Sequence, residues 1–292
     1  MKHRGVLVWS VVLAVAVLAG VLGARAHGAQ AQGDHTAYLP LISSSPPGPT
    51  IHYFRANVEI ADPGDTIRLE WASTGGVEAS LWRISRGGPI AEFWDVAPTG
   101  AFTYTINTTE REYVQFSLYV ADAEGVSSGA SLTIPLTCPD TWFFSPEPDG
   151  CPGAPAHFAD GAEQPFESGT MVWVDEVGAD GQPGIYVLYD DEIFSPRWAF
   201  YPDTWEEGEP MCDVGAAPPG LYQPQRGFGK LWCDEPGVRD RLGWATEPET
   251  GYETALQRDS APKYSTLYVR AADGNVWKLL PERSGWEKII VD

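Results

Sequence analysis

The stretch Thr66-Ile67-Arg68-Leu69-Glu70-Trp71 alternates polar and apolar residues at every position. A period of two places the apolar side chains on one face of a β-strand and the polar side chains on the other. Turns rich in Gly and Pro separate this strand from similar ones between Ile51 and Leu136. The clearest of these are Phe102-Tyr104-Ile106, Val114-Phe116-Leu118-Val120 and Leu132-Ile134-Leu136. About seven short strands of this kind predict a β-sandwich over residues 51–136.

The ends of these strands carry a family likeness. Pro63-Gly64 leads into the strand that ends at Trp71, and Tyr113, Phe116 and Leu118 lie in a late strand that precedes a polar turn. This arrangement resembles a bacterial immunoglobulin-like domain, although the cysteine pair of antibody domains is absent from 51–136. The resemblance implies a fold and no activity, because such sandwiches carry many unrelated functions.

The four cysteines all lie beyond residue 137 and mark a second module at 138–292. Lys2, Arg4 and the apolar run over 6–22 predict export, and an even number of cysteines in an exported chain indicates disulfides. Three pairings are possible, and sequence proximity favours Cys138 with Cys151 and Cys212 with Cys233. These bridges would close loops of 14 and 22 residues, each stabilising the fold by roughly 3 kcal/mol on the loop-entropy model.

An internal repeat organises the second module. Pro139-Asp140-Thr141-Trp142 recurs as Pro202-Asp203-Thr204-Trp205. After each copy come aromatic-rich strands, beginning near Gln164 in the first half and near Gln257 in the second. We expect two meanders of three strands each, with two short helices between them at 228–233 and 236–242. The fold class is therefore mainly β, with an immunoglobulin-like sandwich followed by a disulfide-stapled β module with short helices.

Two segments of this module carry a second likeness. Leu242-Gly243-Trp244-Ala245 precedes Gly251-Tyr252-Glu253 and Gln257, and Gln164-x-Phe166-Glu167-x-Gly169-x-Met171-x-Trp173 lies in the first half. Together they resemble the LGFP-type repeats of bacterial cell-envelope proteins, with Trp244-Ala245 standing where that repeat has Phe-Pro. The resemblance covers about 138–292, and it implies association with the cell envelope rather than a reaction.

The first 31 residues read as an export signal. Lys2 and Arg4 precede an apolar run over 6–22, and the small residues around Ala26 and Ala31 offer cleavage sites. The alternative is a retained membrane anchor, because the run approaches the roughly 20 residues that span a bilayer. In both cases the folded part lies outside the cell or at its surface. A Ser- and Pro-rich linker at 32–50 follows the signal.

Charge narrows the classes of partner. Cleavage after Ala26 leaves 40 acidic and 16 basic residues, a formal charge of −24. Nucleic acids and anionic membranes require basic surfaces, so we expect neither as a partner, and membrane contact only through an uncleaved N-terminal segment. Neither a C-x-x-C pair nor a D-x-D-x-D-G loop occurs, so we expect no metal site and no cofactor. The acidity is typical of solubility outside the cell.

Catalytic residues are hard to find in this sequence, and we assign none. Cleavage after Ala31 leaves His35, His52 and His157, none of which lies in a nucleophile motif. The remaining route is a pair of carboxylates, as in glycoside hydrolysis. Candidate clusters are Asp175-Glu176, Asp190-Asp191-Glu192 and Glu206-Glu207-Gly208-Glu209, which lie in expected turns where acids are ordinarily solvated.

Tryptophan is the more informative residue, because eight of the twelve tryptophans lie in the second module. Exposed aromatic rings stack on sugars or anchor protein partners, whereas buried ones fill the core. Trp205 and Trp244 lie beside turns, and we predict that they bind ligand. Trp173 and Trp277 lie within strands, and we predict that they belong to the core.

These observations favour an exported, noncatalytic protein of the cell surface or envelope that binds a cell-wall or extracellular glycan, with a surface protein as the other possible partner. The alternative hypothesis is a secreted carbohydrate-active hydrolase that uses paired carboxylates of the second module. Partly buried carboxylates meeting in an aromatic cleft would favour the hydrolase.

Overall fold

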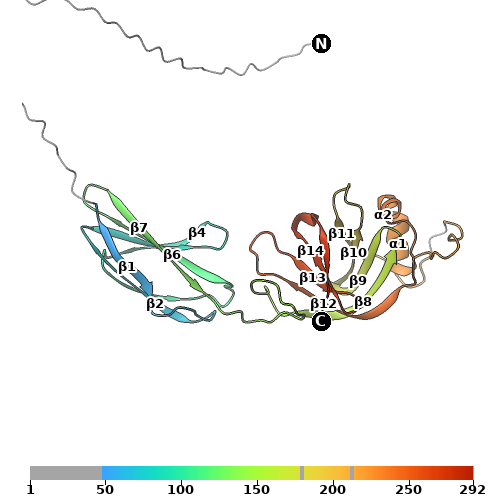
Figure 1. The fold of residues 1–292 in the computed structure, drawn as a ribbon, viewed down its shortest axis with the longest axis horizontal. Coiled ribbons are helices and arrows are strands. Elements are labelled where there is room, and N and C mark those ends of the chain that lie inside the picture. Colours follow the sequence, from blue (N-terminus) through green and yellow to red (C-terminus); the bar gives the residue numbers. More distant parts are fainter. Residues whose placement is uncertain (1–47, 178–180, 211–213, 292) are drawn as a thin grey trace, which may run out of the picture. The chain divides into compact units, whose positions relative to one another are not determined.

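The computed structural model describes residues 48–177, 181–210 and 214–291. The signal or anchor predicted at 1–31 and most of the linker predicted at 32–50 lie outside these residues. Over the described ranges, no helix is both long enough and apolar enough to cross a membrane. The chain is mainly β, as predicted, and its strands form several sheets (Figure 1).

Seven antiparallel strands form the first module in two sheets, with the orders β1-β2-β5 and β4-β3-β6-β7. The fourth strand pairs with the third, so the second sheet has four strands. The predicted number of strands is confirmed, whereas the immunoglobulin likeness stays a prediction. The strands are β1 (Thr50–Ala56), β2 (Thr66–Thr74), β3 (Glu78–Ile84), β4 (Ile90–Val96), β5 (Gly100–Thr105), β6 (Tyr113–Ala121) and β7 (Ser127–Pro135).

The apolar residues of the alternating strands form one core between these two sheets. Ile67, Leu69 and Trp71 of β2 are all buried, and Val114 and Phe116 of β6 face them across the same core. The indole nitrogen of Trp71 donates a hydrogen bond to the carbonyl of Ala97 at 2.9 Å, so its one polar group is satisfied inside the core. The period-two pattern therefore identified the buried face correctly.

The second module is built on one antiparallel sheet of eight strands, in the order β11-β10-β9-β8-β12-β13-β14-β15. Each half is a meander of four strands rather than the predicted three. The additional strands are β8 and β12, which pair with each other at the centre of the sheet. The first half contains β8 (His157–Phe166), β9 (Gly169–Val177), β10 (Gln182–Tyr189) and β11 (Trp198–Pro202). The second contains β12 (Thr250–Arg258), β13 (Leu267–Arg270), β14 (Val276–Leu279) and β15 (Trp286–Ile289), preceded by a 3-10 turn at Pro281–Arg283.

The register shows that the two halves are related by an approximate two-fold axis. Gln164 and Gln257 are both buried, and they lie at matching places near the ends of β8 and β12. The same separation of 93 residues joins Asp160 to Glu253, and these two residues are directly paired across β8 and β12. Equivalent residues face each other only on a two-fold axis. The sequence repeat is therefore a structural duplication centred on this pair.

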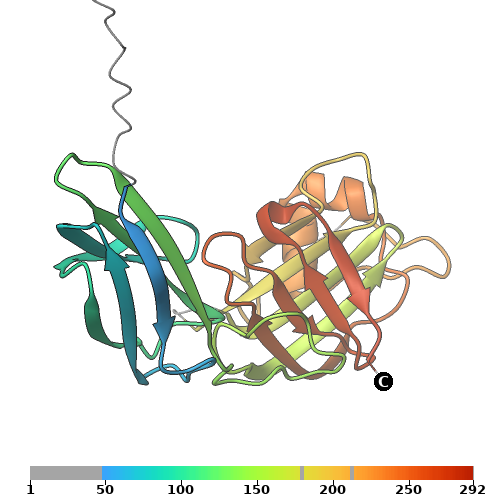
Figure 2. The ribbon, with the colours of Figure 1, turned by 60° about the vertical axis from the view of Figure 1, so that its left-hand side comes forward.

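The eight-stranded sheet is apolar on both faces. Its inner face holds Val172, Leu188, Val269 and Leu279 in one cluster, around which the sheet curls. On the outer face of the first half, α1 (Arg226–Asp234) and α2 (Pro236–Leu242) pack against β9 and β10 (Figures 1 and 2). These helices confirm the two predicted at 228–233 and 236–242. On the outer face of the second half, residues 142–144 pack on Tyr268 and Val276.

Two tryptophans join the ends of the curled sheet in matching ways. Trp198 begins β11, and its indole nitrogen donates to the carbonyl of Leu280 after β14 at 2.9 Å. Trp286 begins β15, and its indole nitrogen donates to the carbonyl of Tyr189 at the end of β10, also at 2.9 Å. The two-fold relation places Trp198 on Trp286 and Leu280 on Tyr189, so the two hydrogen bonds are equivalent. They hold together strands that are far apart in the order of the sheet.

The predicted bridge between Cys138 and Cys151 is confirmed. Cys233 is also disulfide-bonded, and Cys212, its predicted partner, lies outside the described residues. The Cys138–Cys151 bridge closes the loop that carries Trp142, whose indole nitrogen donates to the carbonyl of Gly150 at 3.1 Å. The bridge therefore fixes the segment that covers the outer face of the second half.

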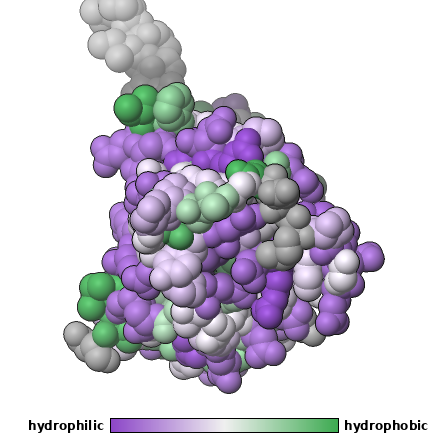
Figure 3. All heavy atoms as spheres, turned by 90° about the vertical axis from the view of Figure 1, so that its right-hand side faces the viewer, coloured by the Kyte–Doolittle hydropathy of each residue, from purple (hydrophilic) through white to green (hydrophobic). Residues whose placement is uncertain are grey.

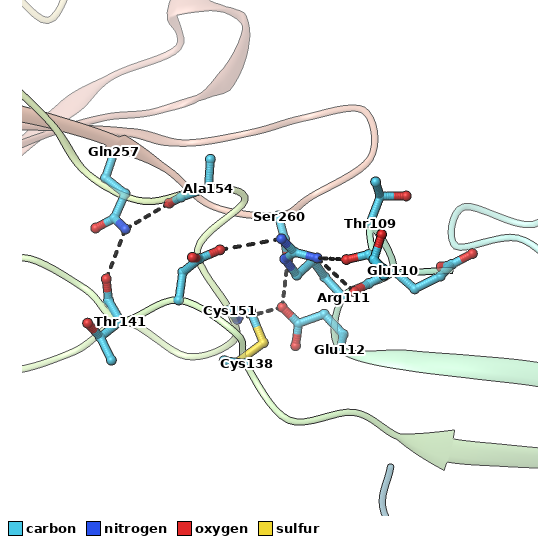
Figure 4. Close-up of polar contacts among 12 residues, drawn as sticks. Thr109, Glu110, Arg111, Glu112, Cys138, Thr141, Cys151, Ala154, Gln257 and Ser260 are labelled. Carbon is cyan, nitrogen blue, oxygen red and sulfur yellow. Dashed lines mark hydrogen bonds and ion pairs between the residues drawn. A yellow bond between two sulfur atoms is a disulfide. The ribbon is translucent and has the colours of Figure 1, made fainter. Parts of the chain in front are cut away.

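Polar side chains connect the first module to this disulfide loop (Figure 4). Glu112 accepts hydrogen bonds from the backbone nitrogen of Cys151 at 2.6 Å and from the hydroxyl of Ser260 at 2.8 Å. Arg111 pairs with Asp140 at 3.3 Å. The apolar clusters of 51–136 and of 142–291 share no residue. Each module therefore has its own core, and independent folding of 51–136 and 138–292 stays a prediction.

Replacing Trp286 by Phe should test the closure of the sheet. A smaller aromatic ring would remain while the hydrogen bond to Tyr189 is lost, and we expect the second module to lose at least about 1 kcal/mol of stability. Trp198→Phe removes the two-fold related bond and should cost a similar amount. Urea unfolding followed by far-UV circular dichroism measures both. A loss in only one variant would contradict equivalent roles for the two bonds.

Candidate functional site

A cavity of about 470 Å³ opens on the outer face of the first half, beside the helices. Its apolar wall is formed by Trp173 of β9, Trp205 of the segment that follows β11, and Phe228 of α1. Its charged groups are Asp203, Glu207, Arg226 and Glu249. A concave site that combines aromatic rings with a few polar groups is the usual form of a ligand pocket.

Asp203 positions both tryptophans. Its Oδ2 accepts a hydrogen bond from the indole nitrogen of Trp173 at 2.8 Å, and its Oδ1 accepts one from the backbone nitrogen of Trp205 at 3.0 Å. A Cβ at Gly227 would lie 2.6 Å from Oδ2, so glycine is needed for the carboxylate to approach the first turn of α1. The positive end of the helix dipole stabilises a carboxylate there.

Two glycines of neighbouring strands form the floor of the cavity. A Cβ at Gly161 of β8 would meet Thr254 at 2.9 Å, so the strands approach too closely for a side chain at this position. A Cβ at Gly251 of β12 would have only the carbonyl oxygen of Gly161 near it, at 3.9 Å. Gly251 therefore faces open space within the cavity, and its missing side chain keeps that space open.

Glu249 is the perturbed acid of the site. Burial raises the pKa of its carboxyl above the usual value of 4.5, Arg226 opposes that shift, and the charge of Asp203 adds to it. The guanidinium of Arg226 lies 3.6 Å from the carboxylate, while 68% of the Arg226 side chain is exposed to solvent. Arg226 therefore offsets only part of the cost of burying this charge.

Trp205 also lines a second, smaller hollow of about 250 Å³, together with Arg226, Glu209 and Lys230. Lys230 donates to the carbonyl of Thr204 at 2.9 Å and pairs with Glu209 at 2.7 Å. These contacts attach the 204–209 segment to α1. Trp205 is half-buried and borders open space in both hollows.

Trp244, the other tryptophan predicted to bind ligand, lies elsewhere. Its ring packs at 5.0 Å from that of Trp232, and it borders a separate hollow with Arg239. The structure therefore does not bring Trp205 and Trp244 into one site. Trp277 is buried as predicted, whereas Trp173 is only half-buried and belongs to the cavity wall.

The two segments that carry the LGFP likeness contact each other directly. The backbone nitrogens of Glu167 and Ser168 donate to the carbonyls of Trp244 and Leu242, both at 3.0 Å. The carboxylate of Glu167 accepts from the backbone nitrogen of Trp244 at 2.8 Å. Gly243 has a φ of +74°, and a Cβ there would lie 2.4 Å from Glu167. The glycine of this motif is thus explained by packing.

The acidic clusters found in the sequence lie mostly away from the cavity. Asp175 is exposed on β9, and the side chain of Glu176 lies outside the described residues. Burial raises the pKa of Asp190. Asp191 pairs with Arg241 at 2.9 Å. Among the acids of these clusters whose side chains the structure describes, only Glu207 lines the cavity.

Sequence reasoning missed Asp203 and Glu249 as members of the site. Asp203 was visible as part of the repeated Pro-Asp-Thr-Trp motif, while nothing in the sequence singled out Glu249. In the described part of the chain, no group of three or more His, Cys, Asp or Glu side chains is placed to hold a metal ion.

The sequence matches no family model, and no curated protein matches it.

The pH dependence of stability should reveal the burial of Glu249. Its pKa is raised in the folded state, so its contribution to stability is present below the unfolded value, near 4.5, and is lost as pH rises through the folded value. Glu249→Gln should therefore gain stability relative to the parent as pH rises above 4.5, and thermal unfolding across pH 4 to 7 measures the difference. A parent that gained stability over the variant would show instead that the pair with Arg226 outweighs burial.

Proposed function

We propose that this chain is an exported, noncatalytic binding protein of the cell surface or envelope, and that its second module binds a glycan in the cavity beside Trp205. One observation carries the proposal: a half-buried indole borders a cavity of about 470 Å³ that also presents charged groups. Sugars have apolar faces that stack on flat rings and hydroxyls that bond to carboxylates and guanidinium groups.

The rigidity of the site supports this proposal. Trp205 is held through its backbone by Asp203, and Lys230 fixes the next turn of chain by bonding to Thr204. Rings that are already in place lose little conformational entropy when a ligand binds. The surface of the second module seen in Figure 3 is mostly hydrophilic, with small scattered apolar patches, which suits a polar ligand better than an extended apolar partner.

The first module is suited to hold the second module in a position where it can bind its ligand. The first module carries its own apolar core and meets the disulfide loop through polar contacts at Glu112 and Arg111. A spacer of this kind would hold the second module away from the wall or membrane. The export signal and the envelope likeness of 138–292 belong to the same proposal.

Glycoside hydrolysis is the second candidate function, because Asp203 and Glu249 are two partly buried carboxylates in an aromatic cavity. Burial raises the pKa of Glu249, which is the direction that favours a general acid. Asp203, however, already uses both oxygens, one on Trp173 and one on Trp205. These bonds direct both oxygens of Asp203 at the protein, whereas a nucleophile or base directs an oxygen at the substrate, so we favour binding without catalysis.

Replacing Trp205 by Ala should weaken glycan binding by about 1 to 3 kcal/mol, because a central aromatic contact is lost. The ligand would first be found by screening the folded chain against cell-wall and extracellular polysaccharides, and calorimetry would then give the affinity. Phe93→Ala is the matched control, since it removes an exposed ring of the first module. Trp244→Ala tests the other predicted position. Unchanged binding in Trp205→Ala would refute the assignment of this cavity.

The hydrolase alternative predicts turnover that depends on Glu249. We expect no release of reducing ends when the chain is incubated with the polysaccharides it binds, and no difference for Glu249→Gln. Turnover that falls at least a hundredfold in Glu249→Gln, a loss typical for a removed general acid, would replace the binding proposal by the enzymatic one.

A further inference from the structure

We propose that the cavity prefers sugar units that carry a free amine, such as those of a deacetylated amino-sugar polymer, over neutral or N-acetylated units. This inference rests on the proposed function and adds to it the chemical class of the ligand. Three features of the structure support it: the charges of the cavity, the exposure of Arg226, and the contents of the two-fold related position in the other half of the sheet.

The charged groups of the cavity favour a cationic ligand. The cavity is lined by three carboxylates and one guanidinium. Asp203 is satisfied by its two hydrogen bonds and by its place at the first turn of α1. Glu207 and Glu249 remain, and Arg226, which pairs with Glu249, is the one cation of the cavity lining. A ligand that brings a positive charge would restore the balance, whereas a carboxylated or sulfated sugar would worsen it.

The geometry leaves room for that charge next to Glu249. Arg226 lies 3.6 Å from the carboxylate, a separation longer than a hydrogen bond, and most of its side chain is exposed. Its guanidinium can turn toward solvent when a ligand cation replaces it beside Glu249, because most of the Arg226 side chain is already exposed. An ammonium group could then take its place beside Glu249. The nearby indole of Trp205 would add the attraction of an aromatic face for a cation.

In the other half of the sheet, a cation of the chain itself lies beside aromatic rings and a carboxylate, as the amine of the proposed ligand would in the cavity. Under the two-fold relation, Gly251 corresponds to Phe158 and Trp173 to Arg270. The Arg270 guanidinium lies 5.4 Å from the ring centre of Phe158 and 5.5 Å from that of Phe143. It also lies 4.0 Å from Glu253. The position equivalent to the cavity is thus filled by a cation among aromatic rings beside a carboxylate.

This comparison also shows what opens the cavity. Phe158 projects from β8, whereas its counterpart Gly251 has no side chain and leaves the space above the strands empty. The backbone of Gly251 does not adopt a left-handed φ, and nothing lies closer to an added Cβ than 3.9 Å. A phenylalanine at 251 would therefore fill the cavity without straining the backbone.

The experiment compares two ligands that differ only in charge, fully deacetylated chitosan oligomers and N-acetylated chitin oligomers of the same length. Calorimetry at low salt and below the pKa of the amines should show the chitosan oligomer binding about tenfold more tightly. The difference should shrink as salt is raised, because screening weakens charge pairs at the surface. Glu249→Gln should reduce the preference between the two oligomers.

Gly251→Phe should abolish binding of both oligomers. Gly237→Phe is its matched control, because a Cβ at Gly237 of α2 meets nothing within 4 Å and its φ, like that of Gly251, is not left-handed. Thermal unfolding of both variants establishes that they fold. An oligolysine should bind at least tenfold more weakly than chitosan, since it carries the charge without the sugar ring.

Each contrary result has a distinct meaning. Chitin binding as tightly as chitosan, with both lost in Gly251→Phe, would overturn the amine preference and leave the proposed glycan site standing. Oligolysine binding as tightly as chitosan would overturn a sugar-specific site and favour a cationic protein partner. Full binding by Gly251→Phe would remove the site from this cavity. Failure of the unaltered chain to bind either oligomer, or any other glycan, would overturn the proposed function as well.

Discussion

The eight-stranded sheet of the second module is apolar on both faces, and this decides what the segments around it must do. Burying one face requires the sheet to curl around Val172, Leu188 and Val269. Burying the other requires cover from elsewhere in the chain. The helices α1 and α2 cover the first half, and residues 142–144 cover the second. The two bonds made by Trp198 and Trp286 hold the curl closed.

The candidate site is a gap in this outer cover. A duplicated sheet offers two equivalent positions, and the chain treats them differently: Phe158 and Arg270 fill one, while Gly251 and Trp173 leave the other open. Because different segments cover the two halves of this symmetric scaffold, a concave surface arises on one of them without disturbing the strands. Asp203 links the two layers at this gap, because it bonds to a strand residue and lies against the first turn of α1.

Much of the fold was predictable because it depends on local pattern. Alternation located the buried residues of β2 and β6, Pro236 marked the start of α2, and short separation identified the partner of Cys138. The pairing of β8 with β12 was not predictable in this way, since it joins strands about 93 residues apart with no turn between them. For that reason each half has four strands where the sequence predicted three.

The site was harder to predict than the fold, because its members come together only through that non-local pairing. Trp205 could be chosen from its turn and its neighbouring acids. Its proximity to Glu249 could not be predicted, because Glu249 immediately precedes β12 and both helices separate it from Trp205 in the sequence. Trp173 was predicted to belong to the core and does pack against the buried cluster beneath the helices, but a strand position alone does not reveal that its outer face is left partly uncovered. Gly251 gave no signal, because a glycine that opens a cavity and a glycine that makes a turn look alike in sequence. Sites of this kind are defined by what the fold leaves uncovered, and residue patterns record mainly what it buries.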